Sequence, residues 1–286
     1  MNPRQNRPHA FHASRATFSR RACSPFPRAI HKKFLLILNF ALAATLTGCA
    51  TPDPIPHYPT LSTQDSLQIL QSRYNNIHTL TAQGLLTLTD PHNNNIRLDI
   101  ALALQPPHNA RLRAWKFSQA VFDLTVTPKG VWIIQPPTSN EHPTTPFDAK
   151  SAATTRQWLA LLATNPMSPD ATIQLQSNKL LIHRPLPHNQ TLTTTLDRQT
   201  LTPRQYTITT AQGQTPFTLM LDHYALFNNI PWPQHITATS PTGKLQLDLH
   251  DIQINPGLPA GAFHPPRRAT KILGAENSAA GLRPNP

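Results

Sequence analysis

Residues 80–104 read LTAQGLLTLTDPHNNNIRLDIALAL. Apolar and polar side chains alternate on both sides of the turn residues 90–95, which is the period of a β-strand with one buried face. The residues on the apolar side are Leu80, Ala82, Gly84, Leu86, Leu88, Ile96, Leu98, Ile100, Leu102 and Leu104. Two such runs joined by a short polar turn predict an antiparallel hairpin whose apolar side chains share one face.

The same alternation recurs, between turns, along most of the chain. Further strands are predicted over residues 111–115, 121–127, 131–135, 172–176, 179–183, 191–196, 205–210, 217–224, 234–239 and 244–254. Ser62 and Asp65 form a helix start, and residues 152–163 predict a second helix that ends before Pro166. Because strands and helices are segregated, the sequence predicts an α+β fold with one large antiparallel sheet.

The apolar face of this sheet has two possible uses. A strongly curved sheet with few helices leaves an apolar cavity for a ligand, as in closed and half-closed barrels. Alternatively, the two helices cover the face and complete an ordinary core. Periodicity alone leaves both uses open.

The N-terminal residues predict export and lipid attachment. Lys32 and Lys33 precede an apolar run, residues 34–47, that ends in Leu46-Thr47-Gly48-Cys49. A basic segment, an apolar core and small final residues form a secretory signal, and the last four residues match the lipobox of bacterial lipoproteins. A membrane-spanning helix would need about 20 apolar residues. We therefore predict a lipoprotein signal peptide over residues 1–48, with Cys49 lipidated; a cysteine that follows glycine by chance is the alternative.

Removal of the signal changes the charge of the chain. The full sequence carries 25 Lys and Arg against 13 Asp and Glu, a net charge of +12. Eight of the basic residues and none of the acidic ones lie in residues 1–48, so the mature chain would carry only +4, with its cations scattered. Nucleic-acid binding needs cations clustered on one face, so we expect no nucleic-acid partner. Cys23 would leave with the signal, which excludes a disulfide and a thiolate metal site.

The sequence contains no catalytic or cofactor signature. GxSxG, HExxH, P-loop and GxGxxG motifs are absent from it, and its 14 histidines are dispersed. We therefore expect no catalytic residue, no metal site, no cofactor and no enzymatic activity. A hydrolase whose site is assembled from scattered residues is the alternative.

The chain divides into a tether, one domain and a tail. Residues 49–60 are rich in proline and predict an extended spacer between the lipid and the domain. Residues 61–266 contain the predicted helices and strands. Residues 267–286 end in small polar residues and predict a disordered tail. Within the longer segment 257–286, order is expected only near Phe263.

Four phrases, in this order, resemble the periplasmic lipoprotein-localisation family of the soluble carrier LolA and the lipidated receptor LolB. They are IHTLTAQGLL at 77–86, RLRAW at 111–115 with the strand pair that ends in Val131-Trp132, YALFNNIPWPQHI at 224–236, and residues 247–254 with FHPP at 263–266. The resemblance implies a half-barrel of about eleven antiparallel strands, lidded by helices around a hydrophobic cavity for acyl chains. Lipidation implies the receptor-like member, to which a soluble periplasmic carrier would deliver its ligand.

The residues predicted to line this cavity lie on one face of the early strands and on the two helices. They are Leu86, Leu88, Leu98, Ile100, Leu102, Trp115, Leu124 and Trp132 in strands, and Leu67, Leu70, Trp158 and Leu162 in helices. A shift of one residue would invert the assignment for any strand.

The resemblance also implies two residues outside the cavity list. The receptor has a protruding apolar residue after an early strand, which corresponds to Phe117 in the loop 116–120. It would form a membrane-transfer loop; an inward-facing core residue is the alternative. The carrier's functional arginine corresponds to either Arg111 or Arg113.

Together these patterns predict a monomeric, lipid-anchored envelope protein that faces the periplasm and binds an acyl chain or a lipoprotein, for lipoprotein localisation. Ala50, where an aspartate would favour the inner membrane, favours the outer membrane. The alternative is an envelope scaffold or assembly lipoprotein with a filled core and no ligand. The volume of the cavity distinguishes the two.

Overall fold

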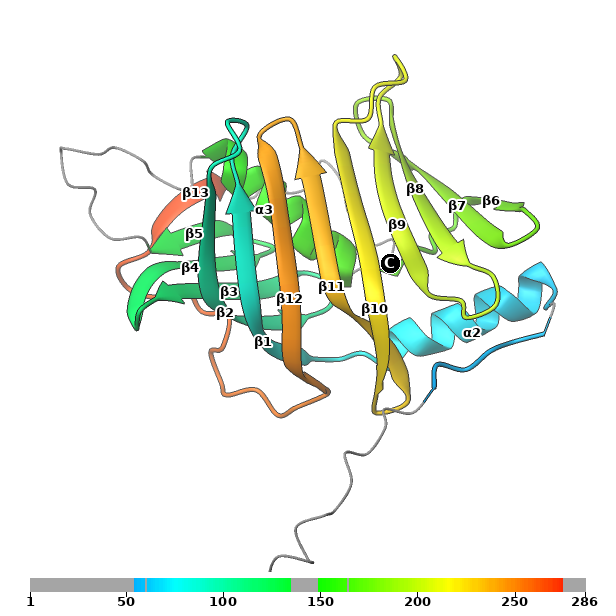
Figure 1. Ribbon diagram of the computed structural model, residues 1–286, viewed down its shortest axis with the longest axis horizontal. Coiled ribbons are helices and arrows are strands. Elements are labelled where there is room, and N and C mark those ends of the chain that lie inside the picture. Colours follow the sequence, from blue (N-terminus) through cyan, green and yellow to red (C-terminus); the bar gives the residue numbers. More distant parts are fainter. Residues whose placement is uncertain (1–53, 60, 135–148, 164, 275–286) are drawn as a thin grey trace, which may run out of the picture. The chain divides into compact units, whose positions relative to one another are not determined.

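The computed structural model describes residues 54–59, 61–134, 149–163 and 165–274 (Figure 1). The predicted signal peptide, the lipidation site Cys49 and residues 275–286 lie outside the described residues. All described residues belong to one compact unit, Pro52–Pro286.

Thirteen strands in the described residues form one antiparallel sheet (Figure 1). They are β1 (Leu80–Thr89), β2 (Asn95–Gln105), β3 (Asn109–Lys116), β4 (Gln119–Thr127), β5 (Gly130–Ile134), β6 (Thr172–Leu175), β7 (Lys179–Leu186), β8 (Gln190–Asp197), β9 (Pro203–Thr209), β10 (Phe217–Phe227), β11 (Ile230–Ser240), β12 (Gly243–Ile254) and β13 (Thr270–Gly274). Their order is β13-β5-β4-β3-β2-β1-β12-β11-β10-β9-β8-β7-β6. The early strands therefore meet the late ones where β1 pairs with β12.

The hairpin predicted over residues 80–104 is confirmed. Leu80 pairs with Leu104 and Leu86 pairs with Leu98, so the apolar side chains of both strands share one face. Gly84 is required where β1 meets β12, because a Cβ there would lie 2.3 Å from the Asp248 carbonyl oxygen.

Two helices contribute to the apolar face of the sheet, which we call the inner face. The first, α2 (Thr63–Asn75), begins where predicted: the Ser62 hydroxyl oxygen accepts a hydrogen bond from the Asp65 backbone N–H. The second, α3 (Ala149–Ala163), places Trp158, Leu159, Leu161 and Leu162 in the large core formed by β1–β5 and β8–β12. Leu70 of α2 instead joins a smaller cluster with Leu180, Ile182, Leu196 and Leu201. The inner face thus carries two apolar clusters, each with its own helix.

Three predictions about the sheet are corrected. The sheet has thirteen strands rather than about eleven. Thr270–Gly274, predicted as part of the disordered tail, forms β13 on β5, which pairs backbone groups that would otherwise be exposed at the sheet edge. β11 begins at Ile230 rather than at residue 234, so two prolines lie inside a strand.

The two predicted cavity residues Trp115 and Trp132 point away from the inner face. Ala114 is buried whereas Trp115 is only half-buried, and the pairing of β3 with β4 shifts between these two residues. On β5 the buried residues are Val131 and Ile133, so Trp132 between them lies on the outer face. The face assignment was wrong for these two residues by one position of the strand alternation.

Candidate functional site

The early strands of the inner face form a filled core rather than an open cavity. Five of the predicted lining residues are at most 2% exposed and pack with α3 in the large cluster: Leu86, Leu98, Ile100, Leu102 and Leu124. Close packing of this kind stabilises the sheet. Space for a ligand must therefore lie at the ends of these strands or elsewhere on the inner face.

A hollow of about 580 Å³ lies at one end of the large core, between α3 and the hairpins β1–β2 and β11–β12. Its apolar residues are Leu88, Ile96, Trp158, Phe217, Ala238 and Leu245, and its polar residues include Asp90, Asn94, Asn95, Ser240, Thr242 and Lys244. We call it the hairpin-end pocket. Of the predicted lining residues, Leu88 and Trp158 lie here. Its volume is in the range of small-molecule sites, about 300–1,000 Å³.

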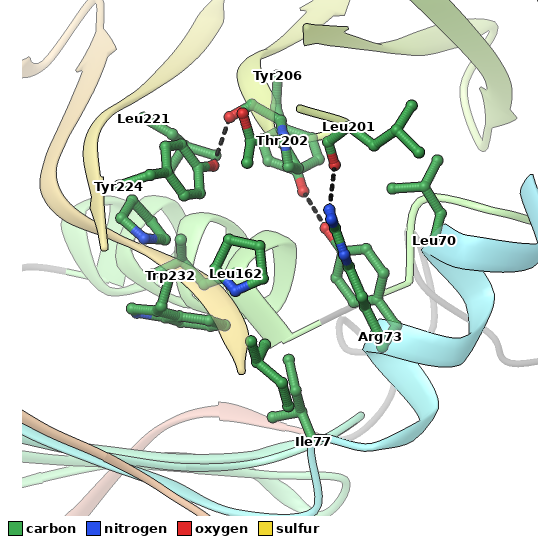
Figure 2. A pocket seen from close by; sticks show the side chains of 15 residues that line it. Leu70, Arg73, Ile77, Leu162, Leu201, Thr202, Tyr206, Leu221, Tyr224 and Trp232 are labelled. Carbon is green, nitrogen blue, oxygen red and sulfur yellow. Dashed lines mark hydrogen bonds between the residues drawn. The ribbon is translucent and has the colours of Figure 1, made fainter. Parts of the chain in front are cut away.

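A second, narrow pocket of about 40 Å³ lies where the two apolar clusters meet (Figure 2). It has room for on the order of three water molecules. Figure 2 shows its side chains converging from α2, α3, the loop before β9, and strands β9–β11. Of the residues predicted to line a ligand cavity, Leu70 and Leu162 line this pocket. We call it the junction pocket.

Arginine and tyrosine side chains give the junction pocket its polar part. Arg73 of α2 donates from Nη1 to the carbonyl oxygens of Thr200 and Leu201, both at 3.0 Å, and from Nη2 to the Tyr58 hydroxyl at 2.9 Å. These bonds hold α2 against the loop between β8 and β9. The Arg73 guanidinium is therefore paired within the protein.

Three tyrosines, the buried Tyr206 and the half-buried Tyr74 and Tyr224, surround the same pocket. The hydroxyls of Tyr74 and Tyr206 are 3.2 Å apart, and the Tyr224 hydroxyl donates to the Pro203 carbonyl oxygen. Burial raises the pKa of Tyr74 to about 12 and the pKa values of Tyr206 and Tyr224 well above their usual range. The phenols are therefore neutral near pH 7 and serve as hydrogen-bonding groups.

Sequence reasoning missed most of the junction pocket. Tyr224 and Trp232 lie in the phrase at 224–236 that resembles the LolA and LolB family, but Tyr224 was predicted only as the end of a strand and Trp232 fell between two predicted strands. Arg73 follows helical spacing on α2 and carries no motif. Only the contact between α2 and the β8–β9 loop identifies it.

One face of α3 contributes a side chain to each pocket. Trp158 lines the hairpin-end pocket and Leu162 lines the junction pocket. These residues are four apart and so lie on one face of the helix, one above the other. The indole nitrogens of Trp158 and Trp232 are buried and, within the described residues, have no hydrogen-bond acceptor. Each pocket is therefore lined by a tryptophan whose buried N–H has no acceptor among the described residues.

The remaining predicted residues lie elsewhere. Leu67 of α2 is half-buried and belongs to neither pocket as described. Trp132 lines a hollow of about 540 Å³ on the outer face, beneath residues 258–265. Phe117 is 87% exposed at the turn between β3 and β4, so the alternative that it is a core residue is wrong.

The two candidate arginines of β3 interact on the outer face. Arg111 forms a bidentate ion pair with Asp123 of β4, at 2.9 and 2.7 Å, and donates to the Ala262 carbonyl oxygen at 3.0 Å. The Arg113 Nε lies 3.4 Å from the same carboxylate. Arg111 therefore holds the C-terminal segment on the sheet instead of facing either inner pocket.

Two further findings concern the described residues. None of their helices is both long and apolar enough to span a bilayer. Nor do their His, Cys, Asp and Glu side chains gather in groups of three or more that could hold a metal ion.

Comparison with known proteins gives a likeness of fold. No protein-family model matches the chain, and no curated protein matches its sequence. A DUF1329 family protein from Desulfovibrio piger matches with a TM-score of 0.50 and 8% identity, over 70% of this chain and 96% of that one.

Two other solved structures match at slightly lower scores. A LolA superfamily protein from Nitrosomonas europaea has a TM-score of 0.47 and 12% identity, over 69% of this chain and 96% of its own. A domain from Vibrio parahaemolyticus named for outer membrane lipoprotein sorting has a TM-score of 0.46 and 12% identity, over 71% and 97% of the two chains. At 12% identity, these two matches are a likeness of fold alone.

Proposed function

We propose that this chain is a lipid-anchored envelope protein that binds the acyl chain of a lipid or a lipoprotein beneath α3. The hairpin-end pocket carries the proposal, because it combines an apolar floor with a polar rim. An amphiphile has the same two parts. Each methylene of an acyl chain that leaves water for an apolar site contributes about 0.8 kcal/mol.

The proposed path of the chain follows the underside of α3. Trp158 and Leu162 lie between the hairpin-end pocket and the junction pocket. A displacement of α3 away from the sheet would join the two pockets into one apolar slot. In this proposal α3 acts as a lid, and its core side chains, Trp158 and Leu162 among them, move away from the early strands as it opens.

The proposed anchor is the diacylglycerol on Cys49, with residues 49–60 as the tether and the outer membrane as the site. A soluble periplasmic carrier would supply the ligand, and the exposed Phe117 would contact the bilayer during transfer. The test of the anchor is Cys49→Ala, which should leave an unprocessed precursor with its N-terminal segment. Processing of this variant to the mature size, with retention on the membrane, would contradict the anchor.

The four tryptophans of the chain allow a test of the proposed site. Four variants each keep one tryptophan and replace the other three by phenylalanine. A fatty acid brominated along its chain should quench Trp158 and Trp232, which line the two inner pockets, and the quenching should saturate. Trp115 and Trp132 on the outer face serve as matched controls and should keep their fluorescence. Equal quenching of all four, or none in folded protein, would contradict the site.

A second function, an envelope scaffold without a ligand, has one observation in its favour. The early strands and α3 already fill the large core with their own side chains. A scaffold would show no saturable quenching at Trp158 or Trp232, while its melting temperature would stay unchanged by any amphiphile.

A further inference from the structure

Arg184 of β7 lies on the inner face, between the two apolar clusters. Side chains alternate along a strand, so Arg184 shares its face with Leu180 and Ile182, which are buried in the smaller cluster. Its partner on β8 is Leu192, which is buried in the large cluster. A charged side chain therefore interrupts an otherwise apolar surface.

The guanidinium of Arg184 lacks the partners that such a position requires. Its Nε and Nη2 are buried, and neither has a hydrogen-bond acceptor among the described residues. Burial also lowers the pKa of Arg184, since desolvation disfavours the charged form. Buried charges in proteins are normally paired, because an unpaired one loses its hydration without compensation.

Other arginines of the same domain show how the chain satisfies a guanidinium. Arg73 has three protein acceptors at 2.9–3.0 Å. Arg111 has both oxygens of Asp123 and a backbone carbonyl. Against these two, the unsatisfied Arg184 is an exception that the fold does not explain.

Arg184 is close to the junction pocket. On the same face of β7, Ile182 pairs with Thr194 of β8, and Thr194 pairs with Tyr206 of β9, so Arg184 lies two strands across from Tyr206 and two residues along. In keeping with this placement, the positive charge of Arg184 counteracts the rise that burial causes in the pKa of Tyr206. Tyr206 lines the junction pocket and contacts the Tyr74 hydroxyl. A group bound at Arg184 would therefore sit beside the pocket where the proposed acyl slot ends.

We propose that Arg184 binds the oxyanion of an amphiphile, a carboxylate or a phosphate, whose acyl chain lies beneath α3. The proposal rests on the proposed function and adds to it a preference for anionic ligands. A planar guanidinium forms two parallel hydrogen bonds with a carboxylate or phosphate, and such bonds are stronger than neutral ones. Nε and Nη2, the two unpaired nitrogens, form one such pair of donors.

The test compares ligands that differ only in their head group. Oleate, oleoyl lysophosphatidic acid and the neutral monoolein are titrated into the mature chain from residue 50, which contains the whole compact unit. Arg184→Met removes the guanidinium and keeps an apolar stem of similar length. Arg97→Met, at an exposed position on the outer side of β2, is the matched control.

The wild type should bind both anionic amphiphiles about tenfold more tightly than monoolein, as expected for a charged hydrogen-bonded pair. Arg184→Met should lose this preference while its affinity for monoolein stays within about twofold of the wild type. Its melting temperature without ligand should rise, because the variant no longer buries an unpaired charge. Arg97→Met should change neither quantity.

The contrary outcomes are distinct. If the wild type binds none of the three amphiphiles, the proposed function is wrong and this inference with it. Equal affinity for all three, unchanged in Arg184→Met, would overturn the role of Arg184 alone. If inorganic phosphate by itself raises the melting temperature as much as lysophosphatidic acid, the site takes a free anion instead of a lipid head group. A large fall in the melting temperature of both Arg184→Met and Arg184→Gln would identify Arg184 as structural.

Discussion

The two apolar clusters of the inner face differ in how they are completed. The large cluster under α3 is closed by leucine, isoleucine and aromatic side chains that contact one another. The smaller cluster under α2 has only five buried members, and a border of tyrosine and arginine side chains separates it from the large one. The large cluster is therefore held mainly by apolar packing, whereas its border with the smaller cluster depends on hydrogen bonds made by Arg73 and the tyrosines.

The first prediction concerns the large cluster, where the effect should be greatest. Leu102 is 2% exposed there, so Leu102→Ala should lower the free energy of unfolding by about 2–5 kcal/mol. Leu88→Ala is the matched change at the border of the hairpin-end pocket, and it should cost clearly less because Leu88 is only half-buried. Urea unfolding measures both. Equal losses would remove the distinction between filled core and pocket wall.

The second prediction concerns the border between the clusters and its dependence on pH. Burial raises the pKa of Tyr74 from 10.0 to about 12, so between these values the folded state keeps a proton that the unfolded state has lost. The contribution of the protonated Tyr74 phenol to the free energy of unfolding should therefore be fully present below pH 10. It should be lost as the pH rises towards 12, which lowers the free energy of unfolding by about 3 kcal/mol. Tyr74→Phe should make the loss of stability between pH 10 and 12 smaller. Thermal unfolding across this range measures it, and an identical slope in wild type and variant would contradict the burial of the phenol.

The third prediction concerns the seam between the early and late strands. Gly84→Ala would place a Cβ 2.3 Å from the Asp248 carbonyl oxygen, so β1 and β12 must separate. We expect a loss of about 1–3 kcal/mol, as for other overpacked sites. Gly257→Ala, which meets no atom within 4 Å, should change stability little. Similar unfolding midpoints for the two variants would show that the seam tolerates displacement.

The smallest expected effect on stability is at Phe117, which belongs to neither cluster. Because its side chain is 87% exposed, Phe117→Ser should change the free energy of unfolding by no more than about 0.5 kcal/mol. Transfer of bound lipid to liposomes should nevertheless slow markedly if Phe117 contacts the bilayer. Unchanged transfer, measured with a fluorescent lipid, would remove Phe117 from the proposed function.

The prediction of the sheet succeeded where one strand face is buried and the other is not. Over residues 80–104 the alternation is uninterrupted, and the register follows from it. It failed at Trp115, because large aromatic side chains are compatible with either face and the shift in pairing after Ala114 is not visible in the sequence. It also shortened β11, because Pro231 and Pro233 argue against a strand.

Those prolines are accommodated by the tertiary structure. Residues 231 and 233 pair only with β10, while the pairing of β11 with β12 begins at His235. Here β11 has a partner on one side only, so its prolines need not donate to a second strand. Which part of a strand has one partner or two depends on the twist and length of its neighbours, and no local pattern contains that information.

The sequence by itself determined that this chain builds one large antiparallel sheet with an apolar face, since a period of two is a property of consecutive residues. It also determined which segments form α2 and α3, because helical spacing and the Ser62 cap are local. Only the tertiary structure decided that Leu86, Leu98 and Leu102 fill a core, because these contacts join residues from separate strands and α3. It likewise decided that two guanidinium nitrogens of Arg184 have no acceptor among the described residues, since whether a buried charge is paired depends on which distant groups fold around it.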